Sequence, residues 1–426
     1  MRSSLTGLCL ALLIPLSSSA AEPSFSEETV RQAVRSVEPV RKRSAKRWKA
    51  GPEYDHRYWI VVHASTKEQR TLLASMGLSI EEVQGDRVSG TAHAKDIALI
   101  KAKGFTVDEM VSLGDLAEKG FPAKDEAFHD YAEMTAVMKG LAAKNPGLVS
   151  MFSAGKAWQG RELWVLRFNS SASGAGPSSK PGVLFMGAHH AREHLSTEVP
   201  LMLAVHLAEN RAKPEIKALL ETRDIYIMPM VNPDGVEYDV ETSQYRWQRK
   251  NMRVNPGGEI GVDLNRNYGY QWGGAGASDQ PYSDTYHGPS AFSEPETQAI
   301  KKFVESRANI KTSVSYHSYG GLIFWPWSYS YDPIPNQEDL KVFKVVAGKM
   351  AALTGYVAEQ SSELYASSGD TDDWMYSARG IFGFTFELEG GSFYPGAAAI
   401  GPAVKKNTAA ALYLIGAAAD LRAAAR

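Results

Sequence analysis

Cysteine is almost absent from this sequence of 426 residues, which contains only Cys9. Cys9 lies in an apolar stretch near the N-terminus and follows Leu8, where a lipid-attachment site would have a small residue. The remainder of the chain can form no disulfide bond, so its stability must come from a packed core. A metal ion bound there must be held by histidine and carboxylate side chains, because no thiolate is available.

A large excess of charge is also lacking, since 46 lysines and arginines stand against 48 aspartates and glutamates. Nucleic acids and membrane surfaces, which attract strongly basic proteins, are therefore not expected as partners. The apolar stretch at residues 8–16 is too short to span a bilayer. With Arg2 before it and small residues after it, it predicts a secretory signal peptide at residues 1–20 and a secreted or periplasmic protein. We expect a monomer.

Residues 21–118 show periodicities of their own and predict a small domain with its linker. Apolar alternation and turn residues predict four strands, at 58–62, 78–83, 87–92 and 105–107, and two helices, at 67–75 and 96–103. The order β-α-β-β-α-β is typical of a ferredoxin-like α+β sandwich.

Residues 119–426 alternate apolar strands with amphipathic helices. The predicted strands are 163–168, 182–186, 224–230, 312–316 and 382–387, and the predicted helices are 131–144, 196–210, 294–306, 337–354 and 403–418. This pattern predicts an α/β fold with a mixed, mostly parallel sheet covered by helices on both faces. Functional sites in such sheets lie beyond the carboxyl ends of the strands.

Possible metal ligands follow one of these predicted strands. His190 and Glu193 are three residues apart, so both side chains can reach one metal ion from a helical turn, and His317 ends another apolar strand. Two imidazoles and one carboxylate, with a fourth position for water, are typical of a catalytic zinc site. The short pattern alone also arises by chance in long chains.

Further blocks follow in a fixed order and give the pattern its specificity: Arg246-Trp247-Gln248-Arg249, Asp263-Leu264-Asn265-Arg266-Asn267, Ser315-Tyr316-His317-Ser318-Tyr319, Tyr365, and Phe384-Thr385-Phe386-Glu387. Together they resemble the zinc carboxypeptidases of the A/B type, the funnelin family, from about Phe128 to the C-terminal helix. The resemblance implies a carboxypeptidase-like fold, one Zn²⁺ per catalytic domain, and peptide or protein C-termini as substrates.

Catalytic roles follow from the same resemblance. Glu387 ends an apolar strand, where a carboxylate is costly to bury unless it has a function. We expect it to be the general base that takes a proton from the water activated by zinc and later passes a proton to the leaving amine. Arg249 is the candidate for stabilising the oxyanion.

Substrate contacts are also implied. Arg266 and Asn265 are expected to bind the terminal carboxylate, because a planar guanidinium can form two hydrogen bonds with it. Tyr365 is expected to close over that carboxylate, Arg192 to line the neighbouring subsite, and Ser318-Tyr319 to contact the substrate.

Specificity is predicted to depend on two acids. In the family, an acid at the position of Asp372 lies at the base of the pocket for the departing residue's side chain and selects lysine or arginine. The physical argument agrees, because an unpaired carboxylate at the bottom of a closed pocket favours a cation. Asp370 is a second acid where the animal enzymes have glycine. It could share the charge or broaden the preference.

The small domain resembles the propeptides of secreted funnelins, which implies a lid over the active site and an activating protease. Lys119 and Lys124 in the linker are the candidate cleavage sites. The alternative that the domain stays attached, and assists folding or positions the substrate, also remains open.

Three other functions are compatible with parts of the sequence. His190, Glu193 and His194 also fit the inverted zincin motif of endopeptidases. The same fold could instead cleave peptidoglycan stem peptides, since diaminopimelate also carries an amine. An inactive binding protein is the third, although intact His190, Glu193, His317 and Glu387 argue against it.

Overall fold

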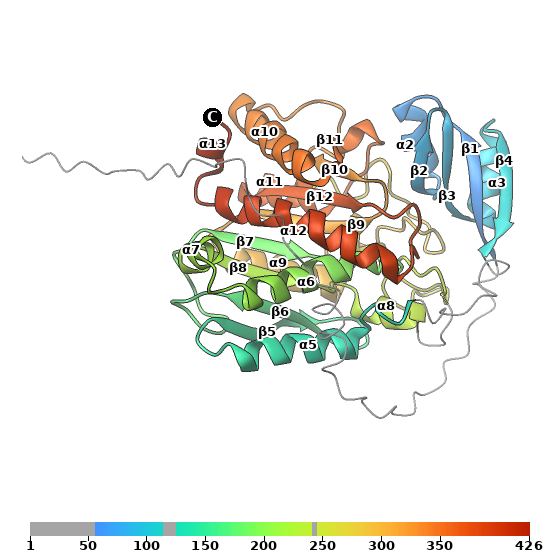
Figure 1. Ribbon diagram of the computed structural model, residues 1–426. Coiled ribbons are helices and arrows are strands. Elements are labelled where there is room, and N and C mark those ends of the chain that lie inside the picture. Colours follow the sequence, from blue (N-terminus) through green and yellow to red (C-terminus); the bar gives the residue numbers. More distant parts are fainter. Residues whose placement is uncertain (1–55, 114–124, 241–244) are drawn as a thin grey trace, which may run out of the picture.

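The computed structural model describes residues 56–113, 125–240 and 245–426. They form a small N-terminal domain and a larger α/β part, which lie against each other (Figure 1). The predicted signal peptide at residues 1–20 and the linker lysines Lys119 and Lys124 lie outside the described residues. Within the described ranges, no helix has the length and apolar character needed to cross a membrane.

The N-terminal domain is an antiparallel sheet of strand order β2-β3-β1-β4 with two helices. Its elements are β1 Arg57–His63, α2 Lys67–Ser75, β2 Ser79–Gln84, β3 Arg87–His93, α3 Ala94–Ala102 and β4 Val107–Ser112. This is the order that the sequence predicts. The prediction for the last strand was wrong in position, because β4 begins where the predicted strand at 105–107 ends. As an edge strand, β4 exposes Met110 and Val111 instead of burying an apolar run.

The large sheet has eight strands in the order β11-β10-β12-β9-β7-β8-β6-β5. Their bounds are β5 Val149–Lys156, β6 Glu162–Phe168, β7 Gly182–Met186, β8 Asp224–Met228, β9 Ile310–Ser318, β10 Leu322–Trp325, β11 Val357–Gln360 and β12 Phe382–Leu388. The neighbours β12, β9, β7 and β8 are parallel, while β10 pairs antiparallel with β12 and β6 antiparallel with β8. The sheet is therefore mixed, as predicted.

Helices cover both faces of this sheet (Figure 1). α5 Tyr131–Lys144, α6 Leu195–Glu209, α10 Gln337–Thr354 and α12 Ile400–Ala417 pack on one face, and α9 Pro295–Glu305 and α11 Thr371–Arg379 pack on the other. The remaining helices are α7 Pro214–Thr222, α8 Pro233–Val240, α13 Leu421–Ala424 and the short 3₁₀ turns η3 Leu264–Arg266, η4 Ser361–Glu363 and η5 Ala397–Ala399.

The apolar sequence of β7 explains why the central strands are buried on both sides. Val183 and Phe185 belong to the core beneath α6, whereas Leu184 and Met186 belong to the core beneath α9. Successive side chains of a strand point to opposite faces, so a strand between two helical layers must be apolar at every position. The strand ends abruptly at Gly187, where a Cβ would lie 2.0 Å from the carbonyl oxygen of Ser196.

A buried acid lies where the two parts of the molecule meet. Asp96 of α3 is 2% exposed, and its Oδ2 has no hydrogen-bond partner among the described residues. Burial and the Asp284 carboxylate of the larger part together raise the pKa of Asp96 to about 7. The backbone N–H of His93 and the ammonium groups of Lys250 and Lys95 lower it.

We expect the stability of the protein to fall as pH rises through the range from about 4 to about 7, because folded Asp96 retains its proton where the unfolded chain has lost it. Asp96→Asn removes that cost and should raise the free energy of unfolding by about 1–3 kcal/mol at pH 8. At pH 4 it should have little effect. Thermal unfolding of both proteins across this range measures the difference, and an equal effect of the substitution at both pH values would contradict the prediction.

Candidate active site

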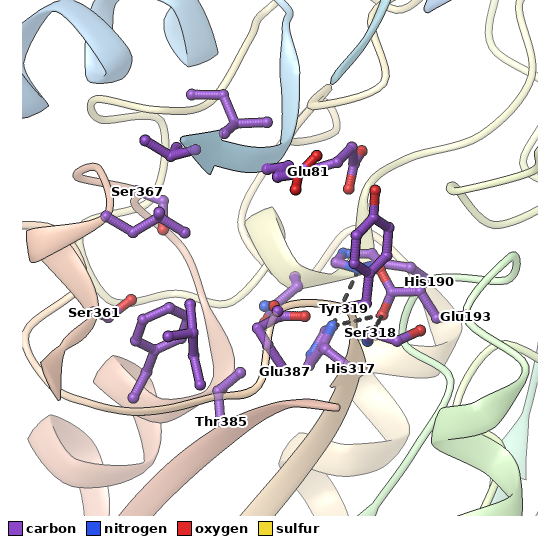
Figure 2. Close-up of a pocket in the computed structure, with 18 of the residues that line it drawn as sticks. Glu81, His190, Glu193, His317, Ser318, Tyr319, Ser361, Ser367, Thr385 and Glu387 are labelled. Carbon is purple, nitrogen blue, oxygen red and sulfur yellow. Dashed lines mark hydrogen bonds and ion pairs between the residues drawn. The ribbon is translucent and has the colours of Figure 1, made fainter. Parts of the chain in front are cut away.

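Three potential metal ligands meet at the carboxyl ends of β7 and β9. His190 and Glu193 lie on the turn after β7, and His317 is near the end of β9. The Nδ1 atoms of His190 and His317 are 3.1 Å apart, and the Glu193 carboxylate lies 2.7 Å from the first and 3.0 Å from the second. All three side chains are buried (Figure 2), and their ligand atoms lie within 4.8 Å of one another.

The outer nitrogens of both imidazoles are already engaged. His190 donates from Nε2 to Asp263 Oδ1 at 3.1 Å, and His317 donates from Nε2 to Ser315 Oγ at 3.0 Å. In the tautomer that carries the proton on Nε2, each ring turns an unprotonated Nδ1 toward one point beside a carboxylate, an arrangement that suits a cation. Two nitrogens and a carboxylate oxygen with an open fourth position fit catalytic zinc. Asp263 was not predicted as a functional residue, although it begins one of the blocks that carry the family resemblance.

Strand register places the candidate base beside these ligands. β12 runs parallel to β9 with Glu387 opposite His317, so both side chains reach the same cavity. Removal from water raises the pKa of the Glu387 carboxyl well above its usual range, and the negative charges of Glu193 and Glu81 act in the same direction. Arg249 opposes them. A carboxyl group in such surroundings is suited to accept and return protons.

The two candidate cationic residues are fixed in place by hydrogen bonds. Arg249 is 4% exposed and donates from Nε and Nη2 to Asp263 Oδ2 at 3.0 and 2.9 Å. Arg266 donates to Gly276 O at 3.0 Å and to Tyr365 Oη at 3.1 Å. Tyr365 therefore already lies over Arg266.

Asn265 has a defined amide orientation. Its Oδ1 accepts from the backbone N–H of Thr371 at 3.1 Å and from the Thr371 hydroxyl at 2.8 Å. Two donors at one oxygen fix that oxygen as the acceptor, so the amide nitrogen is the other end of the side chain. Asn265 and Arg266 both line the cavity.

The two acids predicted to set specificity occupy different places. Asp370 lines the cavity and also caps α11, where its Oδ1 accepts from the Asp373 N–H at 2.8 Å. Asp372 accepts a hydrogen bond from Thr385 Oγ1 at 2.8 Å, and its Oδ1 has no hydrogen-bond partner in the described part of the chain. Burial and the nearby Asp370 carboxylate raise the pKa of Asp372 well above its usual range. Asp372 thus lies behind Thr385, which itself lines the cavity.

Most of the predicted site residues meet in one cavity of about 430 Å³. Its lining includes His190, Glu193, Arg249, Asn265, Arg266, His317, Ser318, Tyr319, Tyr365, Asp370 and Glu387. Two of the predicted site residues, Arg192 and Asp372, are not among the described residues that line the cavity. His194 is turned elsewhere and donates from Nε2 to Asp239 Oδ2 at 2.8 Å, so the inverted zincin arrangement is not formed.

The N-terminal domain supplies part of the cavity wall. Ile80, Glu81, Glu82 and Val83 of β2 line it, and Figure 2 shows Glu81 on the side opposite Glu387. Glu81 forms an ion pair with Arg192. No sequence motif marks Glu81, because its place in the cavity wall depends on how the two parts of the molecule dock.

Arg192 is fully buried between the two parts of the molecule. It donates to Thr91 Oγ1 at 3.1 Å and Ser79 Oγ at 3.2 Å in the N-terminal domain, and lies 3.5 Å from Asp284. Its guanidinium is thus engaged with β2 and β3 instead of facing the cavity.

Comparison with known proteins agrees with this geometry. The family model described as "Zinc carboxypeptidase" matches residues 134–410. A zinc carboxypeptidase of Saccharothrix mutabilis subsp. capreolus is 31% identical over 95% of this chain and 93% of its own length. Carboxypeptidase A2 of Rattus norvegicus is 34% identical over 65% of this chain and 66% of its own.

Solved structures show the same fold. The crystal structure of carboxypeptidase A from Helicoverpa armigera superposes with a TM-score of 0.69 at 24% identity, covering 87% of this chain and 98% of the other. The family match and the two relatives, and not this likeness of fold, show a zinc-dependent carboxypeptidase that acts on peptide C-termini. The chain belongs to the zinc carboxypeptidases of the A/B type.

Proposed function

We propose that the cavity is the active site of a secreted carboxypeptidase that prefers C-terminal lysine or arginine. One observation carries the assignment of the site: the ligand atoms of His190, Glu193 and His317 converge in the cavity that also contains Glu387 and Arg266. Metal ligands, a candidate base and a candidate carboxylate clamp are the parts that removal of a C-terminal residue requires.

The proposed reaction divides the work among the residues of the cavity. His190, Glu193 and His317 would hold zinc, which would supply Lewis acidity at the scissile carbonyl and lower the pKa of the attacking water. The Glu387 carboxylate takes the proton of the attacking water and returns it to the leaving amine. Arg249 supplies positive charge beside the developing oxyanion, and its ion pair with Asp263 holds it there before substrate arrives.

Recognition of the chain end restricts the reaction to the last peptide bond. The Arg266 guanidinium forms a charge-assisted pair with the terminal carboxylate, and the Asn265 amide donates to the same group. Tyr365 already contacts Arg266 and closes the site over it. Ser318 and Tyr319 line the adjoining wall for the remainder of the substrate.

The proposed selection of basic residues rests on charge at the floor of the pocket. Asp370 lines the cavity and Asp372 lies behind Thr385 with one oxygen that has no hydrogen-bond partner in the described chain. A cationic side chain entering here would pair with this buried acid and favour its charged form, whereas an apolar side chain would offer the acid no partner. We assign the selection to Asp372, as the family resemblance implies.

Release of C-terminal arginine and phenylalanine from matched blocked dipeptides tests this proposal. With trypsin-cut protein, arginine should be released at least about tenfold faster in kcat/KM, equivalent to about 1.4 kcal/mol, and a zinc chelator should stop both reactions. Asp372→Asn should abolish the preference by slowing arginine release alone, while the control Asp370→Asn, which keeps the α11 cap, should retain it.

Three results would contradict parts of this account. Comparable rates for both dipeptides in the unaltered enzyme would be compatible with the zinc mechanism but would contradict the preference for C-terminal lysine or arginine. Loss of the preference in Asp370→Asn but not in Asp372→Asn would move the selection to the other acid. Chelator-insensitive release would contradict the zinc mechanism.

We further propose that the N-terminal domain, within residues 21–118, is an inhibitory propeptide cut at Lys119 or Lys124 from the catalytic domain at 119–426. Its strand β2 forms part of the cavity wall, and Glu81 of that strand is held by an ion pair with the buried Arg192 of the larger part. Additional contacts join α2 to the rim of the cavity: Thr71 bonds to Tyr331 at 2.6 Å and Arg70 donates to the carbonyl oxygen of Glu363 at 2.9 Å. Together these contacts keep peptide chains out.

Limited trypsin digestion tests the inhibition. Uncut protein should hydrolyse peptides at least about tenfold more slowly than cut protein. If the N-terminal domain leaves the cavity accessible in less than about a tenth of the molecules, the apparent affinity for peptides falls by at least the same factor. The control is a double variant, Lys119→Gln and Lys124→Gln, which should stay slow after the same treatment. Equal activity of cut and uncut protein would contradict the proposal.

A further inference from the structure

A continuous series of buried hydrogen bonds runs behind the cavity from one metal ligand to the carboxylate clamp. His317 Nε2 lies 3.0 Å from Ser315 Oγ, and Ser315 Oγ lies 3.0 Å from His189 Nδ1. On the other edge of the ring, His189 Nε2 lies 3.3 Å from Thr371 Oγ1, which donates to Asn265 Oδ1 at 2.8 Å. The series joins β9, the turn after β7 and the start of α11.

Each hydrogen bond in the series takes a defined direction once a metal ion is bound at His317 Nδ1. His317 presents Nδ1 to the metal site, so its proton is on Nε2 and is donated to Ser315 Oγ. The Ser315 hydroxyl then has its own proton for His189 Nδ1. His189 must carry its proton on Nε2, which donates to Tyr268 Oη at 2.9 Å and to the more distant Thr371 Oγ1. The Thr371 hydroxyl is left to donate to Asn265.

His189 is the part of this series that few other side chains could replace. A neutral imidazole accepts on one edge and donates on the other, which fits a position between a hydroxyl donor and hydroxyl acceptors. The residue is fully buried, and its ring stacks on that of His317 with centroids 5.5 Å apart and planes inclined by 14°. Its backbone follows Ala188, whose φ of 50° turns the chain so that His189 and His190 reach different partners.

We propose that His189 is a positioning residue that holds the metal ligand His317 through Ser315 and the carboxylate-binding Asn265 through Thr371. Removing the ring leaves Ser315 without its acceptor and Thr371 without one of its donors. His317 then loses a fixed partner for Nε2, and the ring can rotate away from the metal. The inference rests on the ligand and clamp roles proposed above.

Zinc release from the full-length protein into excess chelator is the first measurement. Ser315→Ala and His189→Leu should each weaken zinc affinity by about tenfold to a hundredfold, with correspondingly faster release. The double variant should release zinc little faster than the faster single variant, because both substitutions break the same series. His129→Leu is the matched control: it removes a buried histidine that is bonded to Glu198 at 2.8 Å, and it should release zinc at the wild-type rate.

The second measurement examines the other end of the series. Thr371→Val keeps the shape of the side chain but removes its hydroxyl, so Asn265 keeps only the backbone donor of residue 371. After trypsin cleavage, this variant should raise KM for a blocked dipeptide while zinc release stays at the wild-type rate. His189→Leu should change both quantities. A purely structural role of His189 would change neither relative to the His129→Leu control.

The outcomes separate this inference from the proposed function. His317→Ala must abolish zinc binding if the ligand assignment holds, and retained zinc would overturn the proposed site. If His317→Ala loses zinc but Ser315→Ala and His189→Leu release it at the rate of the control, only the positioning role is overturned. Multiplicative effects of the two single substitutions would also overturn it, since independent sites would then account for the losses.

Discussion

Parallel pairing of β9 with β12 places His317 beside Glu387, and the remainder of the site is arranged around that pair. Both strands are buried between helical layers, so their register is fixed by burial on two faces. If β12 slipped by one residue along β9, Glu387 would turn away from the cavity and Phe386 or Leu388 would take its place. The stability of the core therefore also determines the geometry of the chemistry.

The site concentrates charge that would be unstable without compensation. Glu193, Asp263 and Arg249 are almost fully buried beside two imidazoles whose Nδ1 atoms face the same point. Asp263 connects these groups, because one oxygen accepts from His190 and the other from Arg249. A change at Asp263 would thus disturb metal binding and oxyanion stabilisation together.

Much of this arrangement could be predicted from the sequence, and the reasons for the exceptions are physical. Apolar runs such as 182–186 predicted the buried central strands, whereas β10 and β11 have four residues each and too little pattern to be identified. Motif order predicted the residues that line the cavity. It could not predict that Arg192 would be buried against Glu81, or that Asp372 would lie behind Thr385, because both depend on packing between distant segments.

The central claim is that Glu387 is the base of a zinc-dependent reaction, and Glu387→Gln tests it most directly. Zinc content and kcat should be measured on trypsin-cut wild type and variant. We expect unchanged zinc content and a kcat lower by about 10²–10⁴-fold, since the amide keeps the shape but cannot accept the proton. A variant that retains zinc and hydrolyses the dipeptide at close to the wild-type rate would contradict it.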